Sequence, residues 1–339
     1  MSLAQTAVHA LEGAPIPDAM TRAGVRWLVG QTRRRLASAP VTAERAFVRD
    51  MALHPIAENT AEANAQHYEL PPEFFALALG PRRKYSCCRY GLGDDLATAE
   101  EAALAETCRH ADLQDGQSIL ELGCGWGSLS LWMAEHYPGS RITAVSNSHS
   151  QRRHIEAEAR RLGFGNLEVI TADMNSFCID KTFDRVVSVE MFEHMSNWQG
   201  LLSRVRGWLK PDGRLFAHMV AHRLHPHRID DDSGWIGKYV LAGGVMPSHG
   251  LIGRFPDLFQ VEADWRWSGL HYEQTALDWL ANYDRNATEV MAVLRTVYGD
   301  QARLWFRRWR LFFLATAGLF GHDGGAAWGV SHYRLKPAR

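Results

Sequence analysis

Two carboxylates and one imidazole lie within five residues of each other, at Glu190, Glu193 and His194. Charges of one sign are costly to crowd together in a folded chain unless the protein uses them. Glu190 and His194 are four residues apart, so one helical turn would place both side chains on the same face. A carboxylate beside an imidazole can accept a proton or stabilise a cation, and we predict such chemistry here. An acid-rich helix start with a histidine in the core is the alternative interpretation.

A glycine-rich segment is a second candidate site, in this case for a ligand. Residues 119–127 read Ile-Leu-Glu-Leu-Gly-Cys-Gly-Trp-Gly, so apolar residues surround Glu121 and glycine occurs at Gly123, Gly125 and Gly127. This pattern predicts a buried strand that ends in a sharp turn, which a ligand can approach because glycine has no Cβ atom. The helix expected after the turn favours a carboxylate, since its first N–H groups and its positive dipole end face the ligand. A generic nucleotide loop is the alternative.

The residues after the second predicted strand argue against a dinucleotide ligand. A dinucleotide-binding turn is followed, about 20 residues later, by an acid that binds a ribose hydroxyl. This chain has Val145, Ser146 and Asn147 there, which disfavours NAD. With Glu121 before it, the turn resembles instead the first motif of class I S-adenosylmethionine (SAM) methyltransferases. That resemblance implies that the turn binds the methionyl carboxylate of SAM and that Glu121 lies near its ammonium group.

Polar residues after the second and third predicted strands are candidates for contacts with the nucleoside of SAM. The candidates for the ribose hydroxyls are Ser146, Asn147 and Gln151, with a turn-forming asparagine as the alternative interpretation. Asp173 could accept a hydrogen bond from the adenine amine, and Met174 could cover the ring. A helix N-cap is the alternative role for Asp173.

Composition and charge exclude several classes of function. The chain has 339 residues, of which 46% are apolar and 22% charged, and its net charge is −1. These values are ordinary for a globular protein and predict no nucleic-acid partner. The longest apolar run, residues 311–320, is too short to span a bilayer, so any membrane contact would be peripheral.

Cysteine and histidine usage gives two further predictions. The five cysteines include no CxxC pair, and the first residues lack the pattern of a signal peptide, which together predict a cytoplasmic protein with reduced thiols. Four histidines between positions 218 and 227 could suggest a metal site. No acid or cysteine pattern completes such a site, so we predict no metal.

From about residue 94 the sequence alternates between strand and helix patterns. The strands are predicted at 118–122, 141–145, 167–172, 183–189 and 213–219, and the helices at 97–110, 128–137, 151–162 and 198–209. This alternation predicts a doubly wound parallel α/β sheet that binds ligands at the carboxyl ends of its strands. A strand at 260–267, helices at 275–298 and 301–319, and a strand at 328–335 complete the prediction.

The expected organisation has two parts. Residues 1–93 are predicted to form a helical N-terminal cap that covers the cofactor, and residues 94–339 the methyltransferase domain. Residues 221–258 lack clear periodicity, and an irregular segment of that length predicts a functional insert. Arg33 to Arg35 form a basic run on a predicted helix, which we interpret as a solvated helix packed on the main domain. Contact with a membrane surface or capping of the substrate is the alternative.

Seven motifs follow one another in an order that is typical of one family. They are His67-Tyr68-Glu69, Lys84-Tyr85-Ser86-Cys87-Cys88, the glycine turn, Ser146-Asn147-Ser148, residues 190–195, residues 243–248 and His271-Tyr272-Glu273-Gln274-Thr275. Together they resemble the coclaurine N-methyltransferase branch of the cyclopropane fatty acid synthase superfamily. The resemblance runs from about residue 60 to the C-terminus. It implies a seven-stranded class I methyltransferase sheet with a helical cap and an inserted lid, and SAM as the cofactor.

The resemblance also implies roles for individual residues. Tyr85 and Ser86 would reach the carboxylate or sulfonium end of SAM. Residues 190–194 match the acid-Met-Phe-acid-His segment that supplies the catalytic pair of plant N-methyltransferases. In cyclopropane synthases a bicarbonate ion acts as general base and is held by a cysteine, a glutamate, a histidine and a tyrosine. The matching positions in this chain are Cys87, Glu193, His218 and Tyr272.

The expected methyl acceptor depends on Glu190. Cyclopropane synthases generally carry a small residue at this position, and an extra carboxylate would compete with a bound anion and favour a cationic amine. We therefore expect N-methylation of a small-molecule amine, with Glu190 and His194 orienting the amine and taking up its proton. The alternative is methyl or methylene transfer to an unsaturated fatty-acyl phospholipid, with bicarbonate as the base. Aromatic residues such as Trp265, Trp267 and Trp279 suit either acceptor, and core packing is their alternative role. The sequence predicts no oligomeric state.

Overall fold

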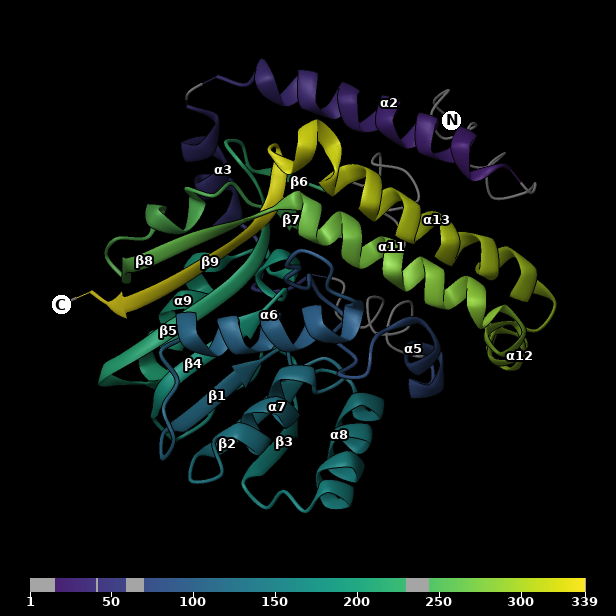
Figure 1. The fold of residues 1–339 in the computed structure, drawn as a ribbon. Coiled ribbons are helices and arrows are strands. Elements are labelled where there is room, and N and C mark those ends of the chain that lie inside the picture. The colour runs from purple at the N-terminus through teal and green to yellow at the C-terminus, as the bar shows by residue number, and fades with distance from the viewer. Residues whose placement is uncertain (1–15, 41, 59–69, 230–243, 339) are drawn as a thin grey trace.

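The computed structural model of the chain describes residues 16–40, 42–58, 70–229 and 244–338 (Figure 1). The predicted motif at 67–69, the acidic residues at 230–232 and the residues Trp235, Tyr239 and Gly243 lie outside the described residues. Within the described ranges, no helix combines the length and the apolar character that crossing a membrane requires.

A seven-stranded sheet forms the centre of the described structure, which confirms the predicted fold class. Its strand order is β3-β2-β1-β4-β5-β9-β8. The strands are β1 (Ser118–Leu122), β2 (Arg141–Ser146), β3 (Leu167–Thr171), β4 (Phe183–Val189), β5 (Leu209–His222), β8 (Phe259–Ser268) and β9 (Trp328–Pro337). Strands β1 to β5 pair in parallel, but β9 runs antiparallel to both β5 and β8. The sheet is therefore mixed at one edge, because the last strand inserts between β5 and β8 instead of extending the parallel series.

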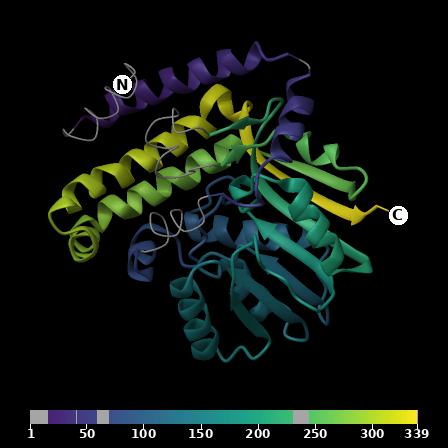
Figure 2. The ribbon, with the colours of Figure 1, turned by 180° about the vertical axis from the view of Figure 1, so that it is seen from behind.

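Helices cover both faces of the sheet, because successive side chains of a strand point to opposite sides. Ile119 of β1 belongs to the core cluster under α6 (Leu96–His110) and α7 (Ser128–His136), whereas Leu120 belongs to the cluster under α9 (Trp198–Trp208). Helix α8 (His149–Leu162) packs beside α7. Figure 2 shows the reverse side of the molecule, where α9 covers the sheet.

A second layer consists of three long helices that lie side by side (Figures 1 and 2). They are α2 (Asp18–Ala37), α11 (Gly269–Arg285) and α13 (Ala302–Phe320). Arg310 of α13 joins them, since its guanidinium donates to Asp18 of α2 at 2.9 Å and to Asp284 of α11 at 2.7 Å. The shorter helices α5 (Pro72–Ala78) and α12 (Ala287–Tyr298) pack against α11. Segments from both ends of the chain therefore build this helical layer.

The prediction of a single helix at 275–298 was wrong. The structure has two helices there, because α11 ends at Arg285 and α12 begins at Ala287. Asn286 separates them, and its side-chain amide donates to the carbonyl of Leu77 at 2.8 Å. Helix α11 also starts earlier than predicted, at Gly269, where a Cβ atom would collide with the backbone carbonyls of two neighbouring segments. These tertiary contacts leave no trace in the periodicity of the sequence.

The described part of the expected insert at 221–258 contains regular structure. Strand β5 continues to His222, and β6 (His227–Arg228) pairs with β7 (Val245–Met246) in a two-stranded sheet. The remaining short elements are α3 (Ala43–Met51) and the 3₁₀ turns η2 (Phe192–His194), η4 (Leu251–Arg254), η5 (Gly299–Gln301) and η6 (His322–Gly325). The two short strands and the 3₁₀ turns are each too short for a periodic pattern to reveal them, whereas α3 lies in the segment that was predicted to be helical.

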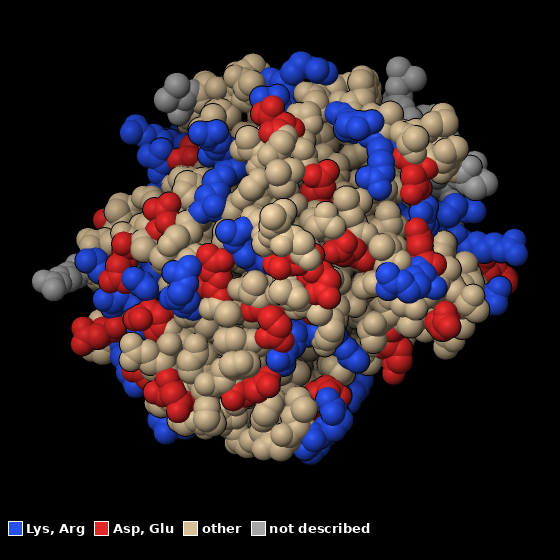
Figure 3. Space-filling model, in the orientation of Figure 1, with Lys and Arg blue, Asp and Glu red and all other residues tan. Residues whose placement is uncertain are grey.

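Charged side chains of both signs are interspersed over the face shown in Figure 3. This distribution agrees with the net charge of −1. Among the described residues drawn on that face, no continuous basic surface of the kind that binds nucleic acids is present.

Trp279 of α11 packs against two predicted site residues. It is fully buried, and its ring lies 5.5 Å from that of Tyr85 and 6.1 Å from that of Tyr272. We expect Trp279→Ala to lower the free energy of unfolding by about 3–5 kcal/mol, because it leaves a large cavity between the sheet and the helical layer. Urea unfolding followed by circular dichroism measures this. The control is Trp27→Ala on the 59% exposed Trp27 of α2, which should change stability by about 0.5 kcal/mol or less.

Candidate active site

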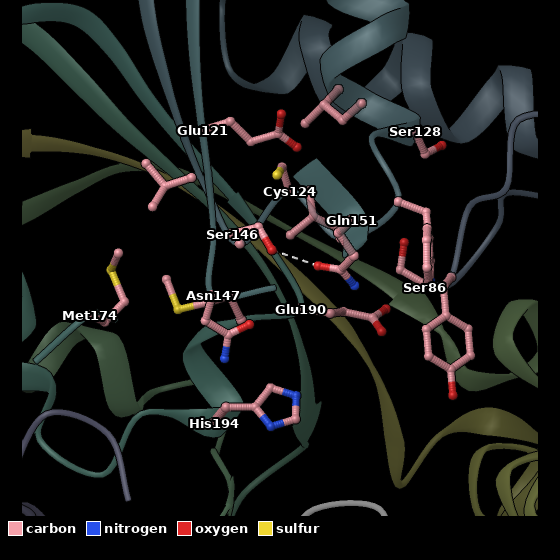
Figure 4. Close-up of a pocket in the computed structure, with 18 of the residues that line it drawn as sticks. Ser86, Glu121, Cys124, Ser128, Ser146, Asn147, Gln151, Met174, Glu190 and His194 are labelled. Atoms are coloured by element: carbon pink, nitrogen blue, oxygen red, sulfur yellow. Dashed lines mark hydrogen bonds between the residues drawn. The ribbon is translucent and has the colours of Figure 1, made fainter. Parts of the chain in front are cut away.

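A pocket opens at the carboxyl ends of β1, β2 and β4, where the alternating strands and helices predicted ligand binding (Figure 4). The predicted site residues that line it are Tyr85, Ser86, Glu121, Gly123, Gly125, Ser146, Asn147, Gln151, Asp173, Met174, Glu190 and His194. The other predicted residues lie outside this lining. Gly127 is the N-cap of α7, and Cys87, Glu193, His218 and Tyr272 lie around Glu190.

The three glycines of the turn have different roles. All three have a positive φ, namely 80° at Gly123, 52° at Gly125 and 83° at Gly127. A Cβ atom at Gly123 would lie 2.7 Å from Met191, and one at Gly127 would lie 2.6 Å from Ile155, so these two positions are restricted by packing. A Cβ atom at Gly125 would meet no protein atom within 4 Å. Gly125 therefore leaves open space in the pocket that a ligand can use.

Glu121 places a buried carboxylate at the base of the pocket. Its side chain accepts a hydrogen bond from the hydroxyl of Ser130 on α7. Burial raises the pKa of Glu121 to about 7, and the bond from Ser130 opposes this rise. A carboxylate in such surroundings is stabilised when a cationic ligand binds beside it.

The end of β2 presents hydrogen-bonding groups to the same pocket. The hydroxyl of Ser146 donates to Gln151 Oε1 at 2.6 Å, as the dashed line in Figure 4 shows. This bond orients the amide, so that Gln151 Nε2 is a donor without a partner among the described residues. Asn147 also lines the pocket. The three residues can therefore contact a ligand that carries hydroxyl groups.

Asp173 and Met174 lie where the chain leaves β3. The backbone N–H of Asn175 donates to Asp173 Oδ1 at 2.7 Å, so this carboxylate stabilises a local turn as well as lining the pocket. The alternative role as a helix N-cap was wrong, because no helix begins among the described residues between β3 and β4. The local turn does not exclude a contact with a ligand. Met174 contributes an apolar surface to the same wall.

Glu190 lies at the centre of the cluster behind the pocket. Its Oε1 accepts from the backbone N–H of Cys87 at 2.9 Å and lies 3.2 Å from His218 Nε2. Its Oε2 accepts from the hydroxyl of Tyr272 at 2.7 Å. Burial raises the pKa of Glu190, whereas the charge of Lys84 and these hydrogen bonds lower it. Three of the four positions that match the bicarbonate shell thus bind the carboxylate of Glu190.

The prediction that one helical turn places Glu190 and His194 on the same face was wrong. Glu190 has a φ of 48°, a left-handed conformation that is rare for a residue with a side chain and that interrupts any helix. The 3₁₀ turn η2 begins only at Phe192. Both side chains still line the pocket (Figure 4), although no hydrogen bond joins these two described residues. Such backbone strain is concentrated at functional sites, where surrounding contacts hold it in place.

The carboxylate of Glu193 contacts the backbone of β5. One of its oxygens accepts from the backbone N–H of Val220 on β5, and Oε2 has no partner among the described residues. Burial, followed by the charge of Glu190, raises the pKa of Glu193 well above its usual range. Burial also lowers the pKa of His194, which keeps its ring neutral in the pocket.

Lys84 is a functional candidate to which the sequence assigned no role. It is buried and lines the pocket, and its ammonium group donates to the Ser86 hydroxyl and to the carbonyl of Cys87 at 2.7 Å. Its charge lowers the pKa of Glu190. The only signal in the sequence was its place in the Lys84-Tyr85-Ser86 motif. Glu58 also lines the pocket, and nothing in the sequence indicated it.

Comparison with known proteins relates this site to characterised enzymes. The family of mycolic acid cyclopropane synthetases matches residues 57–324. The (S)-coclaurine N-methyltransferase of Thalictrum flavum subsp. glaucum is 36% identical over 292 residues, which cover 83% of this chain and 80% of the relative. The cyclopropane-fatty-acyl-phospholipid synthase of Escherichia coli (strain K12) is 30% identical over 257 residues, which cover 75% of this chain and 63% of the relative.

Solved structures of the same two kinds of enzyme are also similar to this chain. A crystal structure of coclaurine N-methyltransferase bound to N-methylheliamine and SAH is 31% identical, covers 98% of this chain and 99% of that chain, and has a TM-score of 0.94. A cyclopropane synthase from Mycobacterium tuberculosis, at 22% identity and a TM-score of 0.70, covers 82% of this chain and 98% of that chain and shows the shared fold. The chain therefore belongs to the mycolic acid cyclopropane synthetase family of SAM-dependent methyltransferases.

Proposed function

We propose that this enzyme transfers a methyl group from SAM to the nitrogen of a small-molecule amine. The proposal rests on the contacts of the Glu190 carboxylate. This carboxylate accepts hydrogen bonds from Cys87 and Tyr272 and lies within contact of His218. A protein carboxylate in this position favours a cationic acceptor and disfavours a second anion. The similarity to N-methyltransferases such as the (S)-coclaurine enzyme supports the same acceptor class.

The residues of the pocket fit the chemical groups of SAM. We propose that the N–H groups of the glycine turn and the start of α7 bind the methionyl carboxylate, with Tyr85 and Ser86 at the same end. Glu121 would bind the ammonium group. Gln151 Nε2, which lacks a partner among the described residues, would bind a ribose hydroxyl with Ser146 and Asn147. Asp173 and Met174 would contact the adenine.

Methyl transfer needs the acceptor nitrogen in line with the S–CH₃ bond, and this demand makes positioning a large part of catalysis. Bound SAM supplies an electrophilic methyl group. Glu190 and His194 line the pocket together and would hold the amine. Glu190 would then accept the amine proton, since burial raises its pKa toward that of an effective base. The charge of Lys84 lowers the pKa of Glu190 and thus favours its ionised form before the amine arrives.

The retained shell residues favour one alternative. Cys87, Glu193, His218 and Tyr272 match the residues that hold bicarbonate in cyclopropane synthases, and a relative of this kind is 30% identical. Transfer to an unsaturated fatty-acyl phospholipid would then use bicarbonate as the base. Peripheral contact with a membrane through the exposed Trp27 of α2 would accompany that function. A screen of amines and phospholipid vesicles with labelled SAM distinguishes the two acceptors.

We also propose that residues 1–93 form a cap and residues 94–339 the catalytic domain, with an insert at 221–258. The contribution of Tyr85 and Ser86 to the pocket supports this division. A cytoplasmic location is supported by the free cysteines, four of which are buried.

Replacement of Gly125 tests the position of the cofactor. We expect Gly125→Val to weaken SAM binding by about 100-fold or more, or about 2.7 kcal/mol, because the new side chain would fill the open space of the turn. Titration calorimetry measures the affinity. Gly116→Val is the matched control, since Gly116 also has a positive φ of 89° and open space around its Cβ position. Unchanged SAM affinity in folded Gly125→Val would place the cofactor elsewhere.

SAM binding should also release protons from Glu121. With its pKa near 7, about half of this carboxyl group is protonated at neutral pH before SAM binds. The ammonium of SAM favours the anion, so up to about half a proton leaves at pH 7 and less as the pH rises above 7. The measured binding heat should therefore vary with the ionisation enthalpy of the buffer. This dependence should vanish in Glu121→Gln, and a buffer-independent heat for the wild type would contradict the assigned contact.

Replacement of Glu190 tests the acceptor and the base together. With an amine acceptor, Glu190→Gln should lower turnover by about 10²-fold or more while SAM affinity stays nearly constant. Activity should not depend on bicarbonate, as assays in carbon-dioxide-free buffer would show. The exposed Glu168 provides the control variant Glu168→Gln, which should behave like the wild type. Strong bicarbonate dependence, with a tolerant Glu190 and a severe effect of Tyr272→Phe, would instead establish the lipid acceptor.

A further inference from the structure

Three buried histidines lead from Glu190 into the protein interior. His218 of β5 and His332 of β9 are direct partners in the antiparallel register, and His110 is the last residue of α6. Their exposed fractions are 1%, 0% and 1%. His218 Nε2 lies 3.2 Å from Glu190 Oε1, and His332 Nδ1 lies 2.8 Å from His110 Nδ1. The ring centroids of His218 and His332 are 4.5 Å apart.

The outer end of this series reaches a surface carboxylate. His110 Nε2 lies 3.5 Å from Glu106 Oε1, and the side chain of Glu106 is 23% exposed. The ring of His110 stacks on Trp265, with centroids 3.8 Å apart and planes within 6°. Contacts between imidazoles and carboxylates thus run from the cluster around Glu190 to the partly exposed Glu106, which is not among the residues that line the pocket.

No hydrogen bond joins the rings of His218 and His332 among the described residues, although their centroids are 4.5 Å apart. Nδ1 of His218 and Nε2 of His332 have no hydrogen-bond partner among the described residues. Unpaired buried polar atoms are costly, and such exceptions in a native structure need an explanation. A phenylalanine would fill either position without that cost. The two unused atoms are the ones that a continuous chain of imidazoles would need at this contact.

We propose that His218, His332 and His110 form a proton relay from Glu190 to Glu106. The inference rests on the proposed N-methylation, in which the amine nitrogen gives up one proton per turnover. Substrate and cofactor would fill the pocket at that moment and separate Glu190 from water. The relay provides a second route for the proton, through the back of the active site.

The transfer keeps protons and charge balanced at each step. The N–H bond of the amine breaks, and an O–H bond forms on Glu190. This proton passes to His218 Nε2 while the proton on His218 Nδ1 moves to His332 Nε2. In turn, the proton on His332 Nδ1 moves to His110 Nδ1, and the proton on His110 Nε2 moves to Glu106 and then to water. Glu190 is again an anion, and the three rings end as the opposite tautomers. Before the next turnover each ring must lose the proton from one nitrogen and gain one at the other.

Arg109 fixes the tautomer of His110 in the described structure. A guanidinium group can only donate, and Arg109 Nη2 lies 3.0 Å from His110 Nε2, which must therefore accept. His110 then carries its proton on Nδ1 and donates it to His332. This is the arrangement that remains after a proton has left. The side chain of Arg109 is 67% exposed, so it is free to move and let Glu106 accept from the same nitrogen.

Burial keeps the three rings neutral, as a relay requires. It lowers the pKa of His218 and of His332 far below the usual range, and it lowers the pKa of His110 to about 4. The rings would therefore pass a proton on rather than store it. The contact of His218 with Glu190 is a hydrogen bond of a neutral imidazole and not an ion pair.

The kinetic test measures methyl transfer and proton release separately in His110→Ala. Rapid quenching measures the methylated amine, and a pH indicator in weakly buffered solution measures the proton. We expect proton release and steady-state turnover to fall by about tenfold or more. Added imidazole should restore both to within about twofold of the wild type by occupying the space of the lost ring. Wild-type proton release in His110→Ala, or failure of imidazole to restore it, would overturn the relay.

His136→Ala is the matched control variant. His136 is also the last residue of its helix, α7, and also stacks on a tryptophan, Trp132, with centroids 3.8 Å apart. It has no contact with the relay residues among the described interactions. His136→Ala should keep wild-type proton release and should not respond to imidazole. Equal losses in both variants would show a structural effect and would contradict the proposal.

A spectroscopic test separates the relay from the proposed function. Nitrogen NMR of protein with labelled histidine reports the tautomer of each ring without any turnover. We expect His110→Ala to change the ring signals of His218, two rings away, while His136→Ala leaves them unchanged. Unaltered His218 signals in His110→Ala would refute the relay. If the protein methylates no amine but the ring signals of His218 change in His110→Ala, the proposed acceptor is wrong and the coupling between the imidazoles is still supported.

Discussion

A buried carboxylate needs hydrogen-bond donors in place of water, and Glu190 obtains them from three separate parts of the chain. Cys87 donates from the loop before α6, Tyr272 from α11, and His218 lies within contact on β5. Because each partner belongs to a different element, this one side chain links the sheet, the loop and the helical layer. The left-handed conformation of Glu190, with a φ of 48°, is a cost that these contacts offset.

The same arrangement bears on the proposed methyl acceptor. The carboxylate of Glu190 and a free anion cannot occupy one position. Glu190 fills the space between Cys87 and Tyr272, so the anion is part of the chain. The negative charge in the pocket then suits a cationic acceptor, with Lys84 near it before the acceptor arrives.

The mixed edge of the sheet has a consequence for the site. Strand β9 inserts between β5 and β8 and runs antiparallel to both, which places His332 opposite His218 in the register. A purely parallel extension of the sheet would have put a different strand beside the cluster around Glu190. The topology thus brings a C-terminal histidine next to a residue that contacts Glu190, and it brings both near the end of α6.

The sequence by itself determined the parallel core, the glycine turn and most of the pocket lining, because these depend on local periodicity and on residues close together in the chain. Glu121, Gly125 and Ser146 follow directly from strands that the alternation predicts. Tertiary structure alone decided the partners of Glu190, the break at Asn286 and the pairing of His218 with His332. These contacts join residues more than 25 positions apart, such as Glu190 and Tyr272, which are separated by 82 positions. Packing between distant elements sets such distances, and no pattern along the chain records them.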